Sequence, residues 1–464
     1  MALRFKNTFS NKVEEFKPID PGKVRMYTCG PTVHDFAHIG NFRTFIFEDL
    51  LRRYLKYKGY ELTHVMNLTD IDDKIIKKST QSKTPLKEFT AKYIQAFFED
   101  LDTLGCERAE MYPAATDHIA EMVEIIKKLV ARGMAYEANG DYYFKIGQFP
   151  KYGKLARLDM EGLKPGARVA SDEYAKETVS DFALWKKWDA KDGDIFWETE
   201  LGKGRPGWHI ECSAMSMKYL GEHFDIHTGG VDNIFPHHEN EIAQSEGATG
   251  HPFVNYWMHS EHLLVEGRKM AKSLNNFYTL RDLLAKGYSG KSVRCLLIST
   301  HYRMQMNFTM SGLDGSAAAL ERYNDFIANL ETYPGGTSSG LAEEFCKNAA
   351  QGFEENLDDD LNISGSLGVV FDFIRDINRL KAENKLSVVE RDAALTLVRK
   401  FDTVLNFAKA TESLDADIEV AIQARTDAKK RKDFAEADRI RQELLAKGII
   451  LEDTAQGVRW KRKG

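Results

Sequence analysis

The chain has 464 residues, of which 43% are hydrophobic, and it carries a formal net charge of −6. That length predicts roughly three domains with enough apolar side chains for a sizeable core. No run of about 18 apolar residues occurs and no apolar stretch follows the first residues, so we expect neither a membrane span nor a signal peptide.

The cysteines indicate the cellular compartment of the protein, and the distribution of charge indicates a kind of binding partner. Five cysteines, at positions 29, 106, 212, 295 and 346, are an odd and sparse set. This predicts a cytoplasmic protein without a disulfide framework, in which cysteines are available as metal ligands. Residues 421–464 hold twelve Lys or Arg and seven Asp or Glu, a local charge of +5 against −11 for the rest. The asymmetry favours a polyanion docking at the C-terminal end, although a solvated basic tail fits the charges equally well.

The first predicted elements form a βαβ unit behind an irregular arm over 1–20. An apolar strand covers 24–27, an amphipathic helix covers 42–58, and a second strand covers 61–68. Strand, helix and strand in this succession imply parallel strands and a right-handed crossover. Thr69-Asp70-Ile71-Asp72-Asp73-Lys74 follows the second strand, at the end where parallel sheets bind their ligands.

The turn between the first strand and the helix is the most informative stretch of the chain. It reads Tyr-Thr-Cys-Gly-Pro-Thr-Val-His-Asp-Phe-Ala-His-Ile-Gly-Asn from Tyr27 to Asn41. A helix N-terminus offers unpaired N–H groups and the positive end of the helix dipole, so this turn is a predicted phosphate site. Cys29 stands at the strand end, where a ligand is expected.

Periodicity places the later elements. Between residues 79 and 272 the predicted elements are helices over 79–104 and 115–132, a strand over 136–146, a weakly periodic insertion over 147–200, helices starting at 208 and 236, strands over 224–230 and 253–258, and a strand and loop over 263–272. From about Ser292 the chain is predicted to be helical, and 361–380 shows a helical-bundle face. The last predicted features are a loop over 333–340, a charged helical segment over 418–447, and a hairpin over 448–453 and 456–460.

Two of these motifs resemble the class I aminoacyl-tRNA synthetases. His38-Ile39-Gly40-Asn41 is similar to their His-Ile-Gly-His signature, and Gly267-Arg268-Lys269-Met270-Ala271-Lys272-Ser273 is similar to their Lys-Met-Ser-Lys-Ser loop. The Gly-Gly-Val-Asp turn over 229–232 lies between them in the family order. The cysteine before Gly-Pro-Thr-Val resembles the cysteinyl-tRNA synthetases in particular. Asn41 in place of His and Ala271 in place of Ser depart from the patterns.

The resemblance implies an α/β fold. We expect a Rossmann-type parallel-sheet catalytic domain with a connective insertion, followed by a helical bundle and a small C-terminal α+β anticodon-binding region. The implied boundaries are 1–115 for the first catalytic half, 116–206 for the insertion, 207–262 for the second half, 263–320 for the lysine loop and stem-contact region, 321–410 for the bundle and 411–464 for the anticodon-binding region.

A metal site is implied at the four positions that match the zinc ligands of the family, Cys29, Cys212, His237 and Glu241. The residues themselves are consistent with this, because thiolate, imidazole and carboxylate suit zinc and a four-residue spacing puts two ligands on one helix face. Spacing from the distant cysteines allows His238 equally well. Buried cysteines and a His/Glu surface ion pair would give the same pattern without a metal.

The resemblance also implies roles for other residues. Thr69, Trp208 and His227 would contact the amino acid, and a packed aromatic is the alternative for Trp208. The ATP-binding set would be His38, Gly40, Asn41, Asp232, Lys269 and Lys272, of which His38, Lys269 and Lys272 would be catalytic. Arg425, Lys429, Lys430, Arg439 and Trp460 would contact RNA, for which a solvated charged helix is the alternative.

The expected activity is therefore cysteine–tRNA ligation. L-cysteine and ATP would form cysteinyl-adenylate and pyrophosphate, and cysteine would pass to the 3′-terminal ribose of tRNA(Cys). One zinc ion per chain would select the thiolate, Mg²⁺ would accompany ATP, and the protein would be a cytoplasmic monomer. Two rivals remain: the cysteine ligase of mycothiol synthesis, which lacks the C-terminal anticodon region, and a non-catalytic RNA-binding relative.

Overall fold

The structure is a computed structural model that describes residues 2–158, 181–274, 276–409, 416–446, 449–454 and 457–462. The chain divides into two compact units, Met1–Phe407 and Ala408–Gly464. Among the described residues, none of the helices combines the length and the apolar character needed to cross a membrane.

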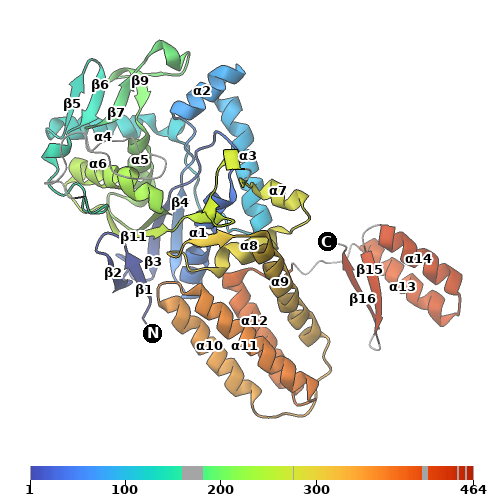
Figure 1. Cartoon of the computed structure of the whole chain (residues 1–464). Coiled ribbons are helices and arrows are strands. Elements are labelled where there is room, and N and C mark those ends of the chain that lie inside the picture. Colours follow the sequence, from blue (N-terminus) through green and yellow to red (C-terminus); the bar gives the residue numbers. More distant parts are fainter. Residues whose placement is uncertain are drawn as a thin grey trace. The chain divides into compact units, whose positions relative to one another are not determined.

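Four parallel strands form the central sheet of the first unit, in the order β11-β10-β3-β4 (Figure 1). Their bounds are Lys23–Thr28 for β3, Glu61–Met66 for β4, Phe224–Gly230 for β10 and Val254–Ser260 for β11. Helix α1, Ile39–Tyr57, links β3 to β4 and packs against β4, β10 and β11, whereas α5, Trp208–Leu220, packs against β3 and β4. The predicted βαβ unit and the α/β fold class are thus confirmed.

A five-stranded antiparallel sheet, in the order β5-β6-β7-β9-β8, lies between the two halves of the parallel sheet in the sequence. Its strands are β5 (Ala135–Ala138), β6 (Asp141–Phe144), β7 (Phe182–Lys187), β8 (Trp197–Thr199) and β9 (Gly202–Pro206). The helices on either side of it in the sequence are α2 (Asp73–Ser82), α3 (Leu86–Leu104), α4 (Ile119–Ala131) and α6 (Glu239–Thr249).

Three predictions from the sequence were wrong about how a segment divides into helices or strands. The strand predicted over 136–146 is a hairpin, because Asn139-Gly140 adopts positive φ at both positions, as a tight hairpin turn requires. The helix predicted over 79–104 is two helices, since Lys83 is left-handed and Pro85 precedes α3. The arm over 1–20 contains an antiparallel pair, β1 (Arg4–Asn7) and β2 (Lys12–Glu15).

The rest of the first unit is a small sheet and a helical bundle. The sheet joins β12 (Leu263–Val265), β13 (Arg268–Lys269) and β14 (Met306–Phe308), and α7 (Leu280–Ala285) and α8 (Gly290–Ser299) lie between β13 and β14 in the sequence. The bundle helices in Figure 1 are α9 (Met310–Glu331), α10 (Ala342–Asp358), α11 (Ile363–Ala382) and α12 (Val388–Leu405). The α11 residues predicted to form a bundle face, Leu367, Val370, Ile374, Ile377 and Leu380, are buried.

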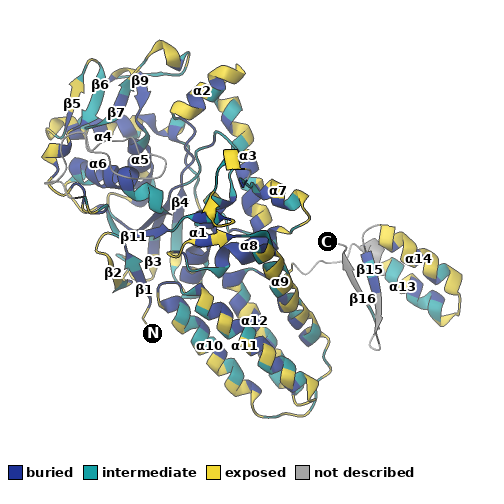
Figure 2. Cartoon of the chain, viewed as in Figure 1, coloured by how far each residue is buried: buried dark blue, intermediate teal, exposed yellow. Residues whose placement is uncertain are grey.

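The second unit contains α13 (Ala416–Lys430), α14 (Phe434–Ala446) and a hairpin of β15 (Ile449–Thr454) and β16 (Gly457–Arg462). The segment predicted as one charged helix is therefore two helices, with Lys432 left-handed between them. Figure 2 colours many residues of these two helices as exposed. A small apolar cluster of Ile440, Leu444, Ile449 and Leu451 joins α14 to the hairpin.

A buried ion pair fixes α1, which carries the predicted phosphate turn, to α8. Arg294 on α8 lies 2.6 Å from Asp49 on α1, and both side chains are buried. Asp49 also accepts hydrogen bonds from Arg53, at 2.8 Å, and from the backbone N–H of Glu107, at 2.7 Å. Burial alone would raise the pKa of Asp49, but Arg294 and Arg53 outweigh it and lower that pKa.

Replacement of Asp49 by Asn should lower the free energy of unfolding by about 3–5 kcal/mol, because it leaves Arg294 buried without its counter-charge. The lowered pKa means that the carboxylate stabilises the fold above its ordinary value near ~4, and that this contribution is lost as the pH falls through the folded-state value. Urea unfolding at pH 7 and at acid pH measures both effects. Asp372→Asn, in an exposed pair with Arg375, is the control and should lose nothing measurable; equal stability of all three proteins at pH 7 would contradict the expectation.

Candidate active site

The ends of three parallel strands bring the predicted ligands to one edge of the sheet. Cys29 follows β3, Thr69 follows β4, and Gly229-Gly230 closes β10. The backbone N–H of Cys29 donates to the carbonyl of Thr228 at 3.2 Å, which extends the β3–β10 pairing to this edge. A side chain at Gly30 would overlap the carbonyl oxygen of Asn67, so glycine is needed where the turn crosses the end of β4.

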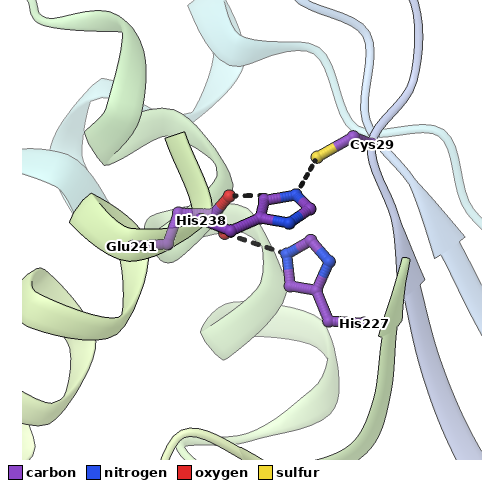
Figure 3. Close-up of side chains that lie close together, drawn as sticks. All are labelled: Cys29, His227, His238 and Glu241. Carbon is purple, nitrogen blue, oxygen red and sulfur yellow. Dashed lines mark hydrogen bonds and ion pairs between the residues drawn. The ribbon is translucent and has the colours of Figure 1, made fainter. Parts of the chain in front are cut away.

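A buried group of thiol, imidazole and carboxylate side chains lies at this edge. Four side chains each offer one ligand atom, and these atoms all lie within 4.8 Å of one another. They are Cys29 after β3, Cys212 on α5, His237 in the short helical turn Ile234–His238 before α6, and Glu241 on α6. A second set, drawn in Figure 3, shares Cys29 and Glu241 but uses His227 and His238. The structure therefore brings the four predicted metal ligands together, and it also keeps the alternative at His238 open.

In the first set, one oxygen of the buried Glu241 carboxylate faces an imidazole nitrogen. His237 Nε2 lies 3.1 Å from Glu241 Oε1, yet this buried oxygen accepts no hydrogen bond among the described residues. A buried carboxylate oxygen without a donor is unfavourable by a few kcal/mol. A divalent cation between the two atoms would satisfy both lone pairs, so the residues fit a metal ion.

The surrounding histidines hold the group from outside. His227 Nε2 lies 2.9 Å from Glu241 Oε2, and His209 Nδ1 lies 3.0 Å from His237 Nδ1. His238 Nε2 lies 3.2 Å from Cys29 Sγ, and its Nδ1 lies 2.8 Å from His259 Nε2. Such contacts to the far side of a ligand fix its orientation and tautomer.

Burial shifts four of these groups toward their neutral forms. It raises the pKa of the Cys29 thiol and of the Glu241 carboxyl, and it lowers the pKa of His237 and His238. The nearby Cys212 raises the pKa of Cys29 further. A bound cation would reverse these shifts for the sulfur and the carboxylate, because it favours their charged forms.

A cleft of about 400 Å³ opens beside the group. Trp208 and Phe235 line it, and the Trp208 ring stacks on His237 with centroids 4.3 Å apart. His227, predicted to touch the amino acid, is buried, lies 2.9 Å from Glu241 and stacks on Trp257 with centroids 4.6 Å apart. Thr69 is buried and accepts a hydrogen bond from Asn67 Nδ2 at 3.1 Å.

Sequence reasoning missed several polar residues of this region. Glu211, His209 and His259 are all buried here, and Glu211 lines the cleft. Burial raises the pKa of Glu211, and the charges of Cys212, Asp70 and Asp72 raise it further. The one available signal for Glu211 was its position on the same helix face as Trp208, three residues away.

The predicted phosphate turn forms a capping box. His38 Nδ1 accepts from the backbone N–H of Asn41 at 3.2 Å, and Asn41 Oδ1 accepts from the backbone N–H of His38 at 3.1 Å. Because Nδ1 is the acceptor, the proton of a neutral imidazole is on Nε2. Asn41 thus performs a capping role at the position where the family signature has His.

The lysine loop lies directly against this turn. A Cβ at Gly40 would stand 3.2 Å from Met270 Cε, and the backbone N–H of Ile39 donates to the carbonyl of Tyr278 at 3.0 Å. Asn276 braces the loop by accepting from the backbone N–H of Ala271 at 2.8 Å and donating to the Lys269 carbonyl at 3.1 Å. The bracing uses the backbone of Ala271, so it does not need a hydroxyl there.

For the other residues predicted to bind ATP or RNA, the structure gives their position in the fold and their exposure. Asp232 follows β10 at the same edge of the sheet, and Lys269 is exposed on β13, whereas the side chain of Lys272 lies outside the described residues. In the second unit Lys430 and Arg439 are exposed, and Arg439 pairs with Glu436 at 2.6 Å.

For two of the residues predicted to contact RNA, the structure describes no side chain at the surface. Arg425 is only 1% exposed, which removes it from the surface available to RNA. The side chain of Trp460 lies outside the described residues.

Comparisons with protein families cover most of the chain. The model of the tRNA synthetases class I (C) catalytic domain matches residues 15–318. The DALR domain matches residues 352–409, and the cysteinyl-tRNA ligase anticodon binding domain matches residues 411–460.

Known proteins similar to this chain agree with these matches. The cysteine–tRNA ligase of Solibacter usitatus is 52% identical over 100% of both chains, and that of Brachyspira hyodysenteriae is 51% identical over 99% of both. Among solved structures, Mycobacterium tuberculosis methionyl-tRNA synthetase with methionyl-adenylate has a TM-score of 0.60 at 13% identity and covers 83% of this chain and 90% of its own. Agrobacterium radiobacter K84 LeuRS, in complex with tRNA and LeuAMS, has a TM-score of 0.62 at 11% identity and covers 84% and 85%. The two structures support the fold.

Proposed function

The chain belongs to the class I tRNA synthetases of the cysteine–tRNA ligase type, and on this premise we propose how its own residues join L-cysteine to tRNA(Cys). The observation that carries the proposal is the buried Cys/His/Glu group at the same sheet edge as the phosphate turn. This arrangement supports sulfur recognition and nucleotide binding at one site. ATP activates the carboxylate of cysteine as cysteinyl-adenylate, and the acyl group then passes to the terminal ribose of the tRNA.

We propose that Cys29, Cys212, His237 and Glu241 hold one Zn²⁺ ion. The convergence of His237 Nε2 on an otherwise unbonded Glu241 oxygen supports this set. His237 can donate its Nδ1–H to His209, as ligating histidines usually do to an acceptor. In the alternative set, Nε2 of His227 and Nε2 of His238 are already in hydrogen bonds to Glu241 and Cys29.

Zinc bound there would supply a soft Lewis acid with a preference for thiolate sulfur over a hydroxyl oxygen. That preference matters because packing discriminates near-isosteres poorly, by roughly 10–200-fold for small apolar differences. The cleft contributes shape through Trp208 and Phe235. Cysteine would thus be selected over serine without a separate editing site.

The activation step requires positioning more than proton transfer. The cysteine carboxylate is already ionised at neutral pH, so it can attack the α-phosphorus of Mg²⁺-ATP without a general base. His38, with its proton on Nε2, donates to phosphate, and the bare backbone at Gly40 allows the nucleotide to approach. Lys269 and Lys272 stabilise the charge that develops on pyrophosphate. Asp232 is the candidate partner of the ribose hydroxyls.

Basic side chains of the second unit are proposed to contact the tRNA anticodon arm. Lys429, Lys430 and Arg439 carry this proposal, because Lys430 and Arg439 are exposed and Lys429 is half-buried. Their contacts would be to phosphate and hence salt-dependent. We further propose a cytoplasmic monomer, because the candidate metal ligands that lie together all belong to one chain and sparse cysteines without a disulfide framework suit a reducing compartment.

Transfer of labelled cysteine to total tRNA, with ATP and Mg²⁺, tests the function. The expected result is stable labelling of RNA by cysteine and none by serine, because only cysteine offers a thiolate to the metal group. Cysteine-dependent pyrophosphate exchange without RNA labelling would point to an amide-forming cysteine ligase. Absence of both reactions would leave an RNA-binding protein without catalysis.

Replacement of Cys212 by Ser should reduce the affinity for zinc by at least about 10-fold, because it removes a thiolate from the proposed ligand set. Metal analysis of purified protein and titration with a zinc-binding dye measure the change. Cys295→Ser is the matched control, since Cys295 is also a buried helical cysteine but lies outside the group. The wild-type protein should hold one zinc per chain; wild-type protein without zinc, or full zinc content in C212S, would reject the assignment.

Replacement of Lys269 or of Lys272 by Ala should slow cysteine-dependent pyrophosphate exchange by about 10²-fold, since each removes a cation from the departing pyrophosphate. The KM for cysteine should change little, because the loop is proposed to act on phosphate. Lys286→Ala, at the end of α7, is the control for loss of an exposed lysine. Unchanged exchange in both loop variants would remove the lysine loop from the mechanism.

A further inference from the structure

A directed chain of hydrogen bonds ends on the buried carboxyl group of Glu211. The backbone N–H of Gly30 can only donate, and it donates to Asn67 Oδ1 at 2.9 Å. The amide of Asn67 therefore presents its Nδ2–H to Thr69 Oγ1, at 3.1 Å. The single hydroxyl proton of Thr69 is then free to be donated, and the carboxyl of Glu211 receives it.

The second oxygen of Glu211 has no partner. Glu211 is 1% exposed, and its Oε2 accepts no hydrogen bond from any described residue. Two basic side chains of the same cleft are already engaged, Lys186 with Asp73 at 2.9 Å and Arg205 with Asp192 at 3.1 Å. A buried, unpaired carboxylate is costly unless a cation joins it.

The position of Glu211 restricts which cation can reach its second oxygen. It lines the cleft with Trp208 and directly precedes Cys212 on the first turns of α5. In cysteine the sulfur and the ammonium nitrogen are separated by only two carbon atoms. A group that binds the ammonium must therefore lie within a few ångströms of the group that binds the sulfur, and Glu211 is close enough to Cys212 for the charge of that thiol to act on its carboxyl group.

We propose that the Glu211 carboxylate binds the α-ammonium group of the substrate cysteine, with Asn67 and Thr69 as the residues that position it. This inference rests on the proposed ligase function and assigns a specificity residue to it. The nearby carboxylates of Asp70 and Asp72 add to the negative potential around Glu211. Thr69, predicted from the family to touch the substrate, would then act through Glu211.

The test compares two thiols that differ only in the ammonium group. Cysteine and 3-mercaptopropionate are titrated calorimetrically into zinc-loaded wild-type and Glu211→Gln protein. Wild-type protein should bind cysteine about 10²-fold more tightly than 3-mercaptopropionate, since a desolvated charge pair is lost with the latter. In E211Q the two dissociation constants should become similar, through weaker binding of cysteine alone.

Glu48→Gln is the matched control. Glu48 is equally buried, accepts a hydrogen bond from the hydroxyl of Thr228 at 2.7 Å and has an unpartnered Oε2, but it does not line the cleft. E48Q should keep the wild-type preference for cysteine. Thr69→Val is a second variant, which retains the charge but frees the Glu211 side chain; it should reduce the preference less than E211Q does.

The outcomes separate this inference from the ligase function. Equal weakening of both thiols in E211Q, or a preference that survives in E211Q and T69V, would overturn the role of Glu211. Pyrophosphate exchange is measured in parallel on the wild-type protein. A wild-type preference that is lost in E211Q supports the inference even if exchange is absent, whereas exchange without any preference rejects the inference and keeps the ligase function.

Discussion

The site depends on one constraint, the burial of two thiols, an imidazole and a carboxylate with converging lone pairs at the edge of a parallel sheet. An apolar interior destabilises the charged forms of these groups, as the raised pKa of Cys29 and the lowered pKa of His237 indicate. A divalent cation would relieve this cost, because it favours the charged thiolate and carboxylate, and it would offer a ligand for sulfur. The hydrogen bonds from His227 and His209 hold the outer sides of the group in place.

The rest of the catalytic unit brings two further chemistries to the same edge. Helix α1 begins there with a capped N-terminus, and its middle is anchored to α8 by the buried pair of Asp49 and Arg294. The lysine loop meets the start of α1 through Met270 and is braced by Asn276. The proposed phosphate-binding, charge-stabilising and thiol-selecting residues thus lie at one edge of the sheet, as a reaction controlled by positioning requires.

Local signals predicted most of the fold correctly but misjudged continuity. Apolar patterns identified β3, β4 and β10, which are buried strands of the sheet, and α1, which packs one face against the sheet. They joined β5 to β6 and α13 to α14, since the turn residues between them, Asn139-Gly140 and Lys432, interrupt the pattern for only a few positions. Arg425 shows a related limit: its charge suggested the surface, yet packing within the second unit buries it.

The sequence by itself determined the fold class, the phosphate turn and the lysine loop, because these are contiguous stretches whose chemistry is set by spacing along the chain. It also supplied the candidate ligands Cys29, Cys212, His237 and Glu241, but it could not choose between His237 and His238. Tertiary structure alone showed that both histidines approach one Glu241 oxygen, His237 at 3.1 Å and His238 at 3.9 Å, and that Glu211 is buried with one oxygen that lacks a hydrogen bond among the described residues. Both depend on contacts between segments far apart in the chain, and burial by distant segments leaves no local pattern in the sequence.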